Sequence, residues 1–283
     1  MRIIILGSSG MLGRYVSSYF KENGYNTVNI DRSSFEVDEN TNKTSIHNLF
    51  EKHGINSSDI IINCIGLIKP QVDKYGVCLS IIVNSLFPNL LANTCQIRNI
   101  RMIHITTDCV FSGKKGSYTE NDAHDVSDIY GRTKSLGEPA NCTVIRTSII
   151  GEEINQKRSL VEWIKSNINK EVNGFEDHFW NGMTCLQVAK VIEQIIKMGN
   201  FWLGIKHIYS NIVNKYELLQ LVNEVYHLNI KVNKVKSNNF CDRTMASVNE
   251  LQFNIPPLKQ QIIEMKKFND IIANQLKKID SKK

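Results

Sequence analysis

Two short stretches of the chain place chemically active side chains at defined positions. The polar run TTDC (residues 106–109) follows an apolar, β-rich run, and Tyr130 and Lys134 are four residues apart in YGRTK. On a helix, residues i and i+4 share one face, so the phenol and the ammonium would lie together. A phenol titrates at about pH 10, and a nearby ammonium favours its phenolate. Tyr130 could therefore protonate a ketone oxygen as hydride arrives, with Thr107 hydrogen-bonded to the same oxygen.

A glycine-rich loop lies near the N-terminus. GSSGMLG places Gly7, Gly10 and Gly13 between an apolar strand expected at residues 2–6 and an amphipathic helix expected at residues 11–24. This context is the one that a dinucleotide-binding loop requires, because the helix N-terminus offers free N–H groups to a pyrophosphate. The alternative is a glycine-rich turn without a ligand. The residues expected at the cofactor are Gly7, Gly10, Met11, Leu12 and Gly13.

Asp31 and Arg32 follow the second expected strand, at residues 26–30. A carboxylate at this position can accept hydrogen bonds from the adenosine ribose, whereas an arginine can bind a 2′-phosphate. The two residues indicate opposite cofactor preferences. The sequence therefore leaves NAD(H) and NADP(H) both open.

Short apolar runs alternate with amphipathic stretches through the first half of the chain. Further strands are expected at residues 59–66, 101–106 and 142–150, and further helices at residues 80–96, with a kink or break at Pro88, and 127–140. Continuous strand hydrophobicity indicates a parallel sheet covered on both faces, which is the doubly wound, Rossmann-like α/β class. After about residue 151 the alternation loosens, with helices expected at residues 159–168, 184–198 and 214–228 and a strand at 204–210.

Composition excludes several classes of protein. The formal charge is +6, but Lys and Arg are scattered and form no basic stripe, which argues against nucleic acid and is compatible with an anionic small molecule or a solvated surface. Seven cysteines without a CxxC pair favour reduced thiols over disulfides or a metal site. The N-terminal apolar run is too short for a signal peptide, and no apolar run is long enough to span a membrane. These features predict a cytoplasmic protein.

The motifs together resemble the extended short-chain dehydrogenase/reductase superfamily. The resemblance rests on GxxGxxG at the first strand, a threonine at the end of a later strand, and YxxxK. Within the superfamily, TTDCVFSG followed by YGRTKSLGE resembles the dTDP-4-dehydrorhamnose reductases, as do INCIG, VNSLFPNLLANTC and VIRTSII. The resemblance covers most of residues 1–150 and is sparse afterwards. Where those reductases carry Q.G.PT, this chain reads NGFEDHFWNGMT, which leaves the natural substrate open.

The resemblance implies a reductase that acts on a nucleotide-activated 4-keto-6-deoxyhexose with NAD(P)H. It divides the chain into a cofactor domain at residues 1–150 and a smaller, mainly sugar-nucleotide-binding domain at 151–283, with some segments returning to the first; a homodimer remains open. Thr107, Tyr130 and Lys134 would be catalytic, and Lys134 would also hold the nicotinamide ribose. The cofactor would also contact Asn63, Cys64, Ile65 and Gly66. The substrate would contact Thr107, Asp108, Cys109, His178, Trp180, Asn181 and Arg243, the last as a pyrophosphate clamp or else a solvated arginine.

Cys109 stands where the rhamnose reductases have tyrosine. Epimerase/reductases such as GDP-fucose synthase resemble the chain here, and they use this cysteine as a base. A thiolate beside a ketone can remove the proton on the neighbouring carbon, because the carbonyl stabilises the enolate. Lys157, Arg158 and His178 are the candidate acids. The alternative is a small buried hydrophobic residue. The sequences TTDCVFSGKKG and HFWNG resemble enzymes of UDP-linked N-acetylated sugars more closely than the dTDP enzymes.

Two other functions compete with reduction. The regulatory subunit of methionine adenosyltransferase resembles the same reductases and acts by binding a partner. A pure binding module has no need of Thr107, Tyr130 and Lys134, so their presence argues against it. A 4,6-dehydratase of the superfamily is disfavoured because Cys109 replaces the glutamate that follows Thr-Asp in those enzymes.

Overall fold

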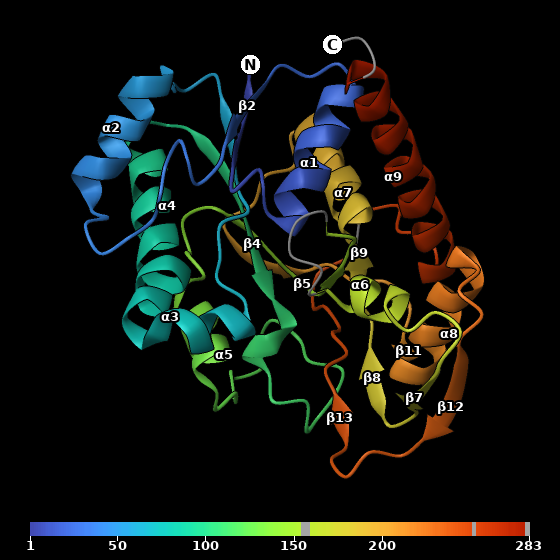
Figure 1. The fold of residues 1–283 in the computed structure, drawn as a ribbon. Coiled ribbons are helices and arrows are strands. Elements are labelled where there is room, and N and C mark those ends of the chain that lie inside the picture. Colours follow the sequence, from blue (N-terminus) through green and yellow to red (C-terminus); the bar gives the residue numbers. More distant parts are fainter. Residues whose placement is uncertain (154–158, 251–252, 281–283) are drawn as a thin grey trace.

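A six-stranded parallel sheet forms the centre of the molecule (Figure 1). The structure is a computed structural model that describes residues 1–153, 159–250 and 253–280. The sheet has the order β10-β5-β4-β3-β1-β2, and every neighbouring pair is parallel. Its strands are β1 (Ile3–Leu6), β2 (Thr27–Ile30), β3 (Ile60–Asn63), β4 (Arg101–Thr107), β5 (Thr143–Thr147) and β10 (Gly204–His207).

Two separate apolar cores explain why the strands are hydrophobic on both sides. In β1, Ile3 and Ile5 belong to one core, while Ile4 and Leu6 belong to the other. Helices α1 (Met11–Glu22) and α7 (Cys185–Met198) contribute to the first core, and α2 (Lys43–His53) and α4 (Phe87–Ile97) to the second. Successive strand residues point to opposite faces, so a doubly covered sheet needs a continuous apolar run. The predicted fold class is confirmed.

The helical stretch before β4 does not break at Pro88, where the sequence predicts a kink or break. Helix α3 (Lys69–Ile81) continues through the π-helix η1 (Ile82–Leu86) into α4, and Pro88 lies in the first turn of α4. The wider π turn immediately before Pro88 accommodates its missing N–H, so the helix does not break there. The non-helical residue is instead Gly76, with φ of 83°. The stretch is long and apolar enough to cross a membrane by length and composition, a test that core helices also pass.

The second half of the chain adds shorter elements beside the sheet. They are β6 (Ile149–Ile150), α6 (Leu160–Lys165), β7 (Glu171–Phe175), β8 (His178–Trp180), β9 (Met183–Thr184), β11 (Val213–Asn214), α8 (Lys215–Tyr226), β12 (Lys231–Val235), β13 (Cys241–Asp242) and α9 (Leu258–Asp280). A small sheet has the order β11-β8-β13, and β12 pairs with β7. From this half, β10 joins the central sheet and α7 packs on α1.

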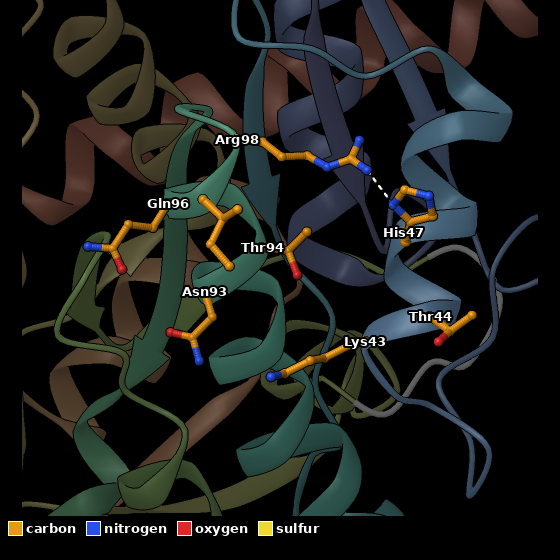
Figure 2. Close-up of a pocket in the computed structure, with 8 residues that line it drawn as sticks. Lys43, Thr44, His47, Asn93, Thr94, Gln96 and Arg98 are labelled. Atoms are coloured by element: carbon orange, nitrogen blue, oxygen red, sulfur yellow. Dashed lines mark hydrogen bonds between the residues drawn. The ribbon is translucent and has the colours of Figure 1, made fainter.

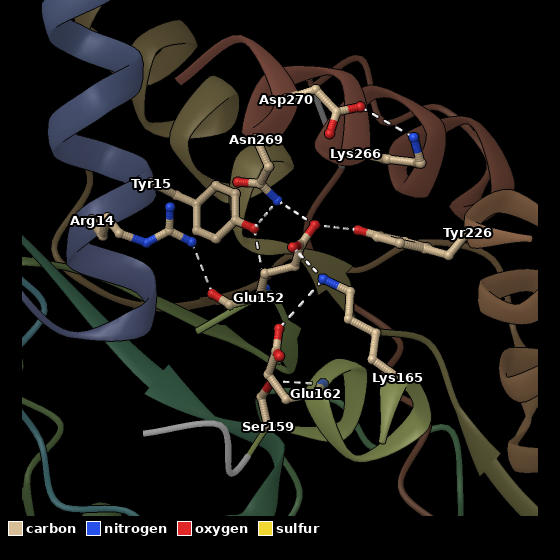
Figure 3. Close-up of polar contacts among 10 residues, drawn as sticks. All are labelled: Arg14, Tyr15, Glu152, Ser159, Glu162, Lys165, Tyr226, Lys266, Asn269 and Asp270. Atoms are coloured by element: carbon tan, nitrogen blue, oxygen red, sulfur yellow. Dashed lines mark hydrogen bonds and ion pairs between the residues drawn. The ribbon is translucent and has the colours of Figure 1, made fainter. Parts of the chain in front are cut away.

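Glu152 ties the first helix to the later ones (Figure 3). Its carboxylate accepts hydrogen bonds from the Tyr226 hydroxyl at 2.5 Å and the Asn269 amide at 2.6 Å, and it forms an ion pair with Lys165. Its backbone N–H donates to the Tyr15 hydroxyl at 3.1 Å. The backbone and carboxylate of this one residue thus connect α1, α6, α8 and α9, which fixes the later elements relative to the helix that follows the glycine loop.

Candidate active site

The glycine loop has the geometry that a dinucleotide requires. Gly7 has φ of 75°, and a Cβ on Gly13 would lie only 2.1 Å from the Gly7 carbonyl oxygen. Gly10 is the N-cap of α1 and has no side chain that could cap the helix. No side-chain cap therefore occupies the N–H groups of the first turn, which belong to Met11, Leu12 and Gly13. An anion such as a pyrophosphate fits this helix start.

Asp31 and Arg32 lie at the end of β2. Asp31 Oδ1 accepts hydrogen bonds from the Ser33 hydroxyl at 2.7 Å and from the backbone N–H groups of Ser33 and Ser34 at 3.0 and 3.2 Å. These bonds, first of all the one from the Ser33 hydroxyl, lower the pKa of the Asp31 carboxyl. Arg32 is exposed and lies 3.9 Å from Glu36. The turn engages one carboxylate oxygen of Asp31, and the Arg32 guanidinium interacts with the Tyr75 hydroxyl and lowers its pKa.

The end of β3 lies next to Lys134. Asn63 Oδ1 accepts a hydrogen bond from the Ile65 N–H at 3.0 Å, and its Nδ2 lies 3.1 Å from His104 Nδ1. Beyond Cys64, a Cβ on Gly66 would be 3.3 Å from Lys134 Nζ. The predicted cofactor residues 63–66 and the predicted ribose-binding lysine therefore lie side by side.

The predicted catalytic residues converge at the end of β4. Thr107 Oγ1 accepts a hydrogen bond from the Cys109 N–H at 3.1 Å, and the Thr107 hydroxyl donates to Asp108 Oδ1 at 3.1 Å. The Thr107 hydroxyl is also close enough to the Tyr130 phenol to influence its pKa. Helix α5 (Ile129–Leu136) carries Tyr130 and Lys134 on one face. It packs closely on the turn after β4, because a Cβ on Gly131 would lie 2.4 Å from the Cys109 carbonyl oxygen. Glycine at 131 is what lets the phenol approach the strand end.

Burial shifts the pKa values of the predicted catalytic groups. It lowers the pKa of Lys134 to about 8, against the opposing attraction of Glu138. Burial, reinforced by the charge of Cys109, raises the pKa of Tyr130, so the phenol carries its proton at neutral pH and can donate it. Burial and the neighbouring Asp108 carboxylate raise the pKa of Cys109 to about 12, while Arg243 opposes that rise.

Asn84 is a further residue of the site that the sequence reasoning missed. Its Oδ1 accepts a hydrogen bond from the Leu67 N–H at 2.8 Å, and its Nδ2 donates to the Leu67 carbonyl at 3.1 Å and to Thr133 Oγ1 at 3.2 Å. One amide therefore ties the loop after β3 to α5, between Tyr130 and Lys134. Asn84 lies in the π turn, a local widening of the helix that the apolar pattern of the stretch does not indicate.

Three of the residues predicted to contact the substrate, Trp180, Asn181 and His178, lie in different surroundings. Trp180 is buried at 6% exposure, and the Asn181 amide is hydrogen-bonded at both ends to the Met245 backbone. His178 Nε2 lies 2.9 Å from the Ser237 hydroxyl and 2.8 Å from the Asn239 carbonyl oxygen. The Asn181 amide and the His178 ring are thus engaged with the protein itself. Lys157 and Arg158, the other candidate acids, lie outside the described residues.

Arg243 and Lys215 bring positive charge to the strand end. Arg243 Nε donates to the Phe111 carbonyl at 3.0 Å, so this arginine is held beside β4 rather than solvated. Its charge interacts with Asp108 and Cys109. Lys215, which the sequence reasoning missed, interacts with the same two residues, and its Nζ lies 5.6 Å from the centre of the Trp180 ring. The carboxyl of Asp108, 3% exposed, therefore lies in the field of two cations.

A surface hollow of about 590 Å³ lies elsewhere, between α2 and α4 (Figure 2). Its lining comes from these two helices and Arg98, and Arg98 is hydrogen-bonded to His47. It includes none of the strand ends that carry Asp31 and Thr107. The convergence of the predicted catalytic side chains, and not this hollow, identifies the candidate active site.

Comparisons with known proteins show the family to which the chain belongs. The model of the RmlD substrate binding domain matches residues 1–276. A dTDP-4-keto-6-deoxy-D-glucose reductase of Streptomyces niveus is 26% identical over 70% of this chain and 69% of its own length. The methionine adenosyltransferase 2 subunit beta of Mus musculus is 25% identical over 80% of this chain and 72% of its own length.

Solved structures share the fold. A dTDP-4-dehydrorhamnose reductase from Bacillus anthracis, determined with NADP, has a TM-score of 0.75 at 18% identity and covers 94% of this chain and 98% of its own. The family model spans nearly the whole chain, including the late segments that carry Lys215 and Arg243. By that match, this chain belongs to the RmlD substrate-binding domain family.

Proposed function

We propose that this protein reduces the C4 ketone of a nucleotide-activated 4-keto-6-deoxyhexose with NAD(P)H, in the cytoplasmic synthesis of deoxysugar or polysaccharide precursors. The observation that carries the proposal is the convergence of Thr107, Tyr130 and Lys134 beside the loop after β3. The reductase named among its relatives, which acts on a dTDP-linked 4-keto-6-deoxy sugar, supports this substrate class. A dTDP or UDP carrier and an N-acetylated sugar both belong to the proposal.

The residues of the glycine loop and of the strand ends fit a nicotinamide dinucleotide. Gly7, Gly10 and Gly13 would take the pyrophosphate at the start of α1, and Asp31 or Arg32 the adenosine ribose. Lys134 and the segment 63–66 would take the nicotinamide riboside. When bound, the reduced nicotinamide supplies the hydride.

The chain's own residues then supply the proton. Thr107 holds the ketone oxygen by a hydrogen bond, and Tyr130 gives that oxygen its phenolic proton while the carbonyl carbon gains the hydride. The carbonyl becomes a secondary alcohol, and the phenolate regains a proton from solvent. Lys134 stabilises the phenolate that forms, because its ammonium lies on the same face of α5.

The two proposed domains follow this division of labour. Residues 1–150 would hold the cofactor and the acid, and residues 151–283 would mainly hold the sugar nucleotide, with β10 and α7 returning to the central sheet. Arg243, fixed beside Phe111, would pair with the diphosphate of the substrate.

We propose in addition that Cys109 epimerises the carbon next to the ketone before reduction. Its N–H is bonded to Thr107, which places the thiol beside the proposed carbonyl site. A thiolate there would take the proton from the neighbouring carbon and leave an enolate. In deuterated water the wild-type product should carry deuterium at that carbon, and Cys109→Ser should give reduced product without it. Unlabelled wild-type product would reduce the proposal to a plain 4-reductase.

The test of reduction is a panel of dTDP-, UDP- and GDP-linked 4-keto-6-deoxyhexoses, with and without an N-acetyl group, assayed with NADH and NADPH. Oxidation of the cofactor and formation of the alcohol by NMR are expected with at least one sugar. If no sugar nucleotide of the panel led to oxidation of NADH or NADPH, the proposal would be contradicted.

The second candidate is a regulatory cofactor-binding subunit, which the similarity to the methionine adenosyltransferase subunit favours. A pure binder would bind NAD(P)H and show no turnover with any member of the panel. The proximity of Thr107 to Tyr130, with Lys134 on the same helix face, supports the enzyme instead.

A further inference from the structure

The proposed epimerisation lacks an identified proton donor. Inversion of a carbon needs one group to remove a proton and a second to return one on the opposite face. His178 is engaged with Ser237 and Asn239 through Nε2, and its ring lies against Phe175 at 4.8 Å between centroids. These contacts direct it toward the turn after β12 and not toward Cys109.

Lys215 is held at the site by the elements on either side of it. It is the first residue of α8, whose N-cap Asn214 and Glu217 form a reciprocal capping box with hydrogen bonds of 2.8 and 2.9 Å. The preceding strand β11 pairs with β8, with Val213 opposite Trp180. This pairing lays the lysine stem beside the indole, so the Nζ position is fixed over the Trp180 ring.

The surroundings of Lys215 suit a proton donor. Its charge interacts with Asp108 and Cys109 on the turn after β4 and with Cys241 and Arg243 on the segment that begins at β13. Burial lowers the pKa of the ammonium, so Lys215 releases a proton more readily than a surface lysine. Arg243 is unsuited to the task, because a guanidinium keeps its proton near neutral pH.

We propose that Lys215 is the catalytic acid that returns a proton to the carbon from which Cys109 removes one. The inference rests on the proposed epimerisation. Cys109 is mostly a thiol at neutral pH, and its small thiolate fraction takes the C–H proton and becomes a thiol. The enolate forms, and the Lys215 ammonium then protonates the same carbon from the other face and becomes an amine. Transfer of the thiol proton to the amine, through Asp108 or water, restores both groups. No redox change occurs until hydride arrives.

The test separates exchange from inversion, without NAD(P)H present. The 4-keto sugar nucleotide is incubated in deuterated water with wild type, Cys109→Ser, Lys215→Met and Lys215→Arg, and NMR follows deuterium entry and configuration at the carbon. Wild type should both exchange the proton for deuterium and invert the carbon, and Cys109→Ser should do neither. Lys215→Met should lose inversion by about two orders of magnitude, the scale of a positioned acid. It should keep exchange with retention, because Cys109 can return a solvent-exchanged proton on its own face.

Lys215→Arg distinguishes a proton donor from a mere positive charge. Arginine keeps the charge but does not donate at neutral pH, so inversion should fall as in Lys215→Met while substrate affinity persists. The matched control is Lys206→Met, which removes a lysine whose Nζ lies 4.8 Å from the Trp202 ring, on β10. It should leave inversion unchanged.

Each outcome bears on one claim. Inversion retained in Lys215→Met or Lys215→Arg would overturn the role of Lys215 and leave the epimerase standing. Wild type that neither exchanges nor inverts, yet still reduces with NAD(P)H, would remove the epimerase and this inference together. Binding of NADPH, measured by its fluorescence, checks that each variant is folded.

Discussion

The reducing side and the substrate side of the candidate site are built in opposite ways. Thr107, Tyr130 and Lys134 stand on a long buried strand and a helix of the central sheet. Trp180, Lys215 and Arg243 stand on or directly after the short strands β8, β11 and β13. Helix periodicity sets the spacing of Tyr130 and Lys134 in the first group, whereas the second group depends on pairing between segments far apart in sequence. A strand and a helix of the central sheet can hold the catalytic residues that a family shares. The short paired strands can hold the residues that select the substrate, which can vary within a family.

The substrate side is nevertheless firmly attached. The Asp242 N–H donates to the Gly113 carbonyl at 2.7 Å, and the Tyr118 N–H donates to the Thr244 carbonyl at 2.9 Å. Glu120 accepts hydrogen bonds from the His207 N–H at 2.8 Å and the Ser247 hydroxyl at 2.6 Å, and these bonds help to lower its pKa to about 2 against burial. The segment after β13 is therefore anchored to the loop after β4, which brings Arg243 to Cys109.

The largest expected effect lies on the reducing side. Tyr130→Phe removes the proton donor, so kcat should fall by about two orders of magnitude or more. NAD(P)H oxidation with the accepted 4-keto sugar nucleotide measures it, and NADPH fluorescence should show unchanged cofactor affinity. A variant with a rate near wild type would exclude Tyr130 as the acid.

A smaller effect of a different kind is expected on the substrate side. Arg243→Gln should raise KM by about tenfold to a hundredfold, the scale of a lost charge-assisted hydrogen bond, with a smaller change in kcat. Exposed Arg132 provides the control, and Arg132→Gln should leave both constants near wild type. A loss in kcat alone would move Arg243 from binding to chemistry.

Thiol labelling tests how burial and Arg243, on the substrate side, affect the reactivity of Cys109. Because its pKa is raised to about 12, only a small fraction is thiolate at pH 7.5, and iodoacetamide should modify it at least about tenfold more slowly than exposed Cys78. Raising the pH toward 9 should speed the reaction at Cys109 while leaving it mostly a thiol. Arg243→Gln should slow it further, since the guanidinium lowers this pKa. Peptide mass spectrometry follows each site, and equal rates would refute the burial argument.

The smallest effect concerns the cofactor. Asp31→Ala should weaken NADH relative to NADPH by a few-fold, because only NADH presents a free 2′-hydroxyl to the carboxylate. Arg32→Ala should do the reverse. Titration of each variant with both cofactors gives the ratio of dissociation constants, and an unchanged ratio in both variants would reject this interpretation of the end of β2.

The differences between prediction and structure have physical causes. Helix α2 was not predicted, because only Ile46, Leu49 and Phe50 are buried in a polar sequence; its start is fixed by the capping box of Asn42 and Ser45. Helix α5 is shorter than the expected 127–140, since it ends at Gly137, where a Cβ would lie 1.7 Å from the Asn84 carbonyl oxygen. The strand expected at 204–210 ends at His207, because its pairing with β5 ends there.

By itself the sequence determined the sheet, the glycine loop and the spacing of Tyr130 and Lys134, because strand and helix periodicity and tight turns depend on neighbouring residues. Only the tertiary structure decided which distant side chains meet Cys109. Lys215 and Arg243 reach it through strand pairing with β8 and through hydrogen bonds to the loop after β4. Such contacts depend on which segments pair and in what register, and no local pattern in the sequence specifies that.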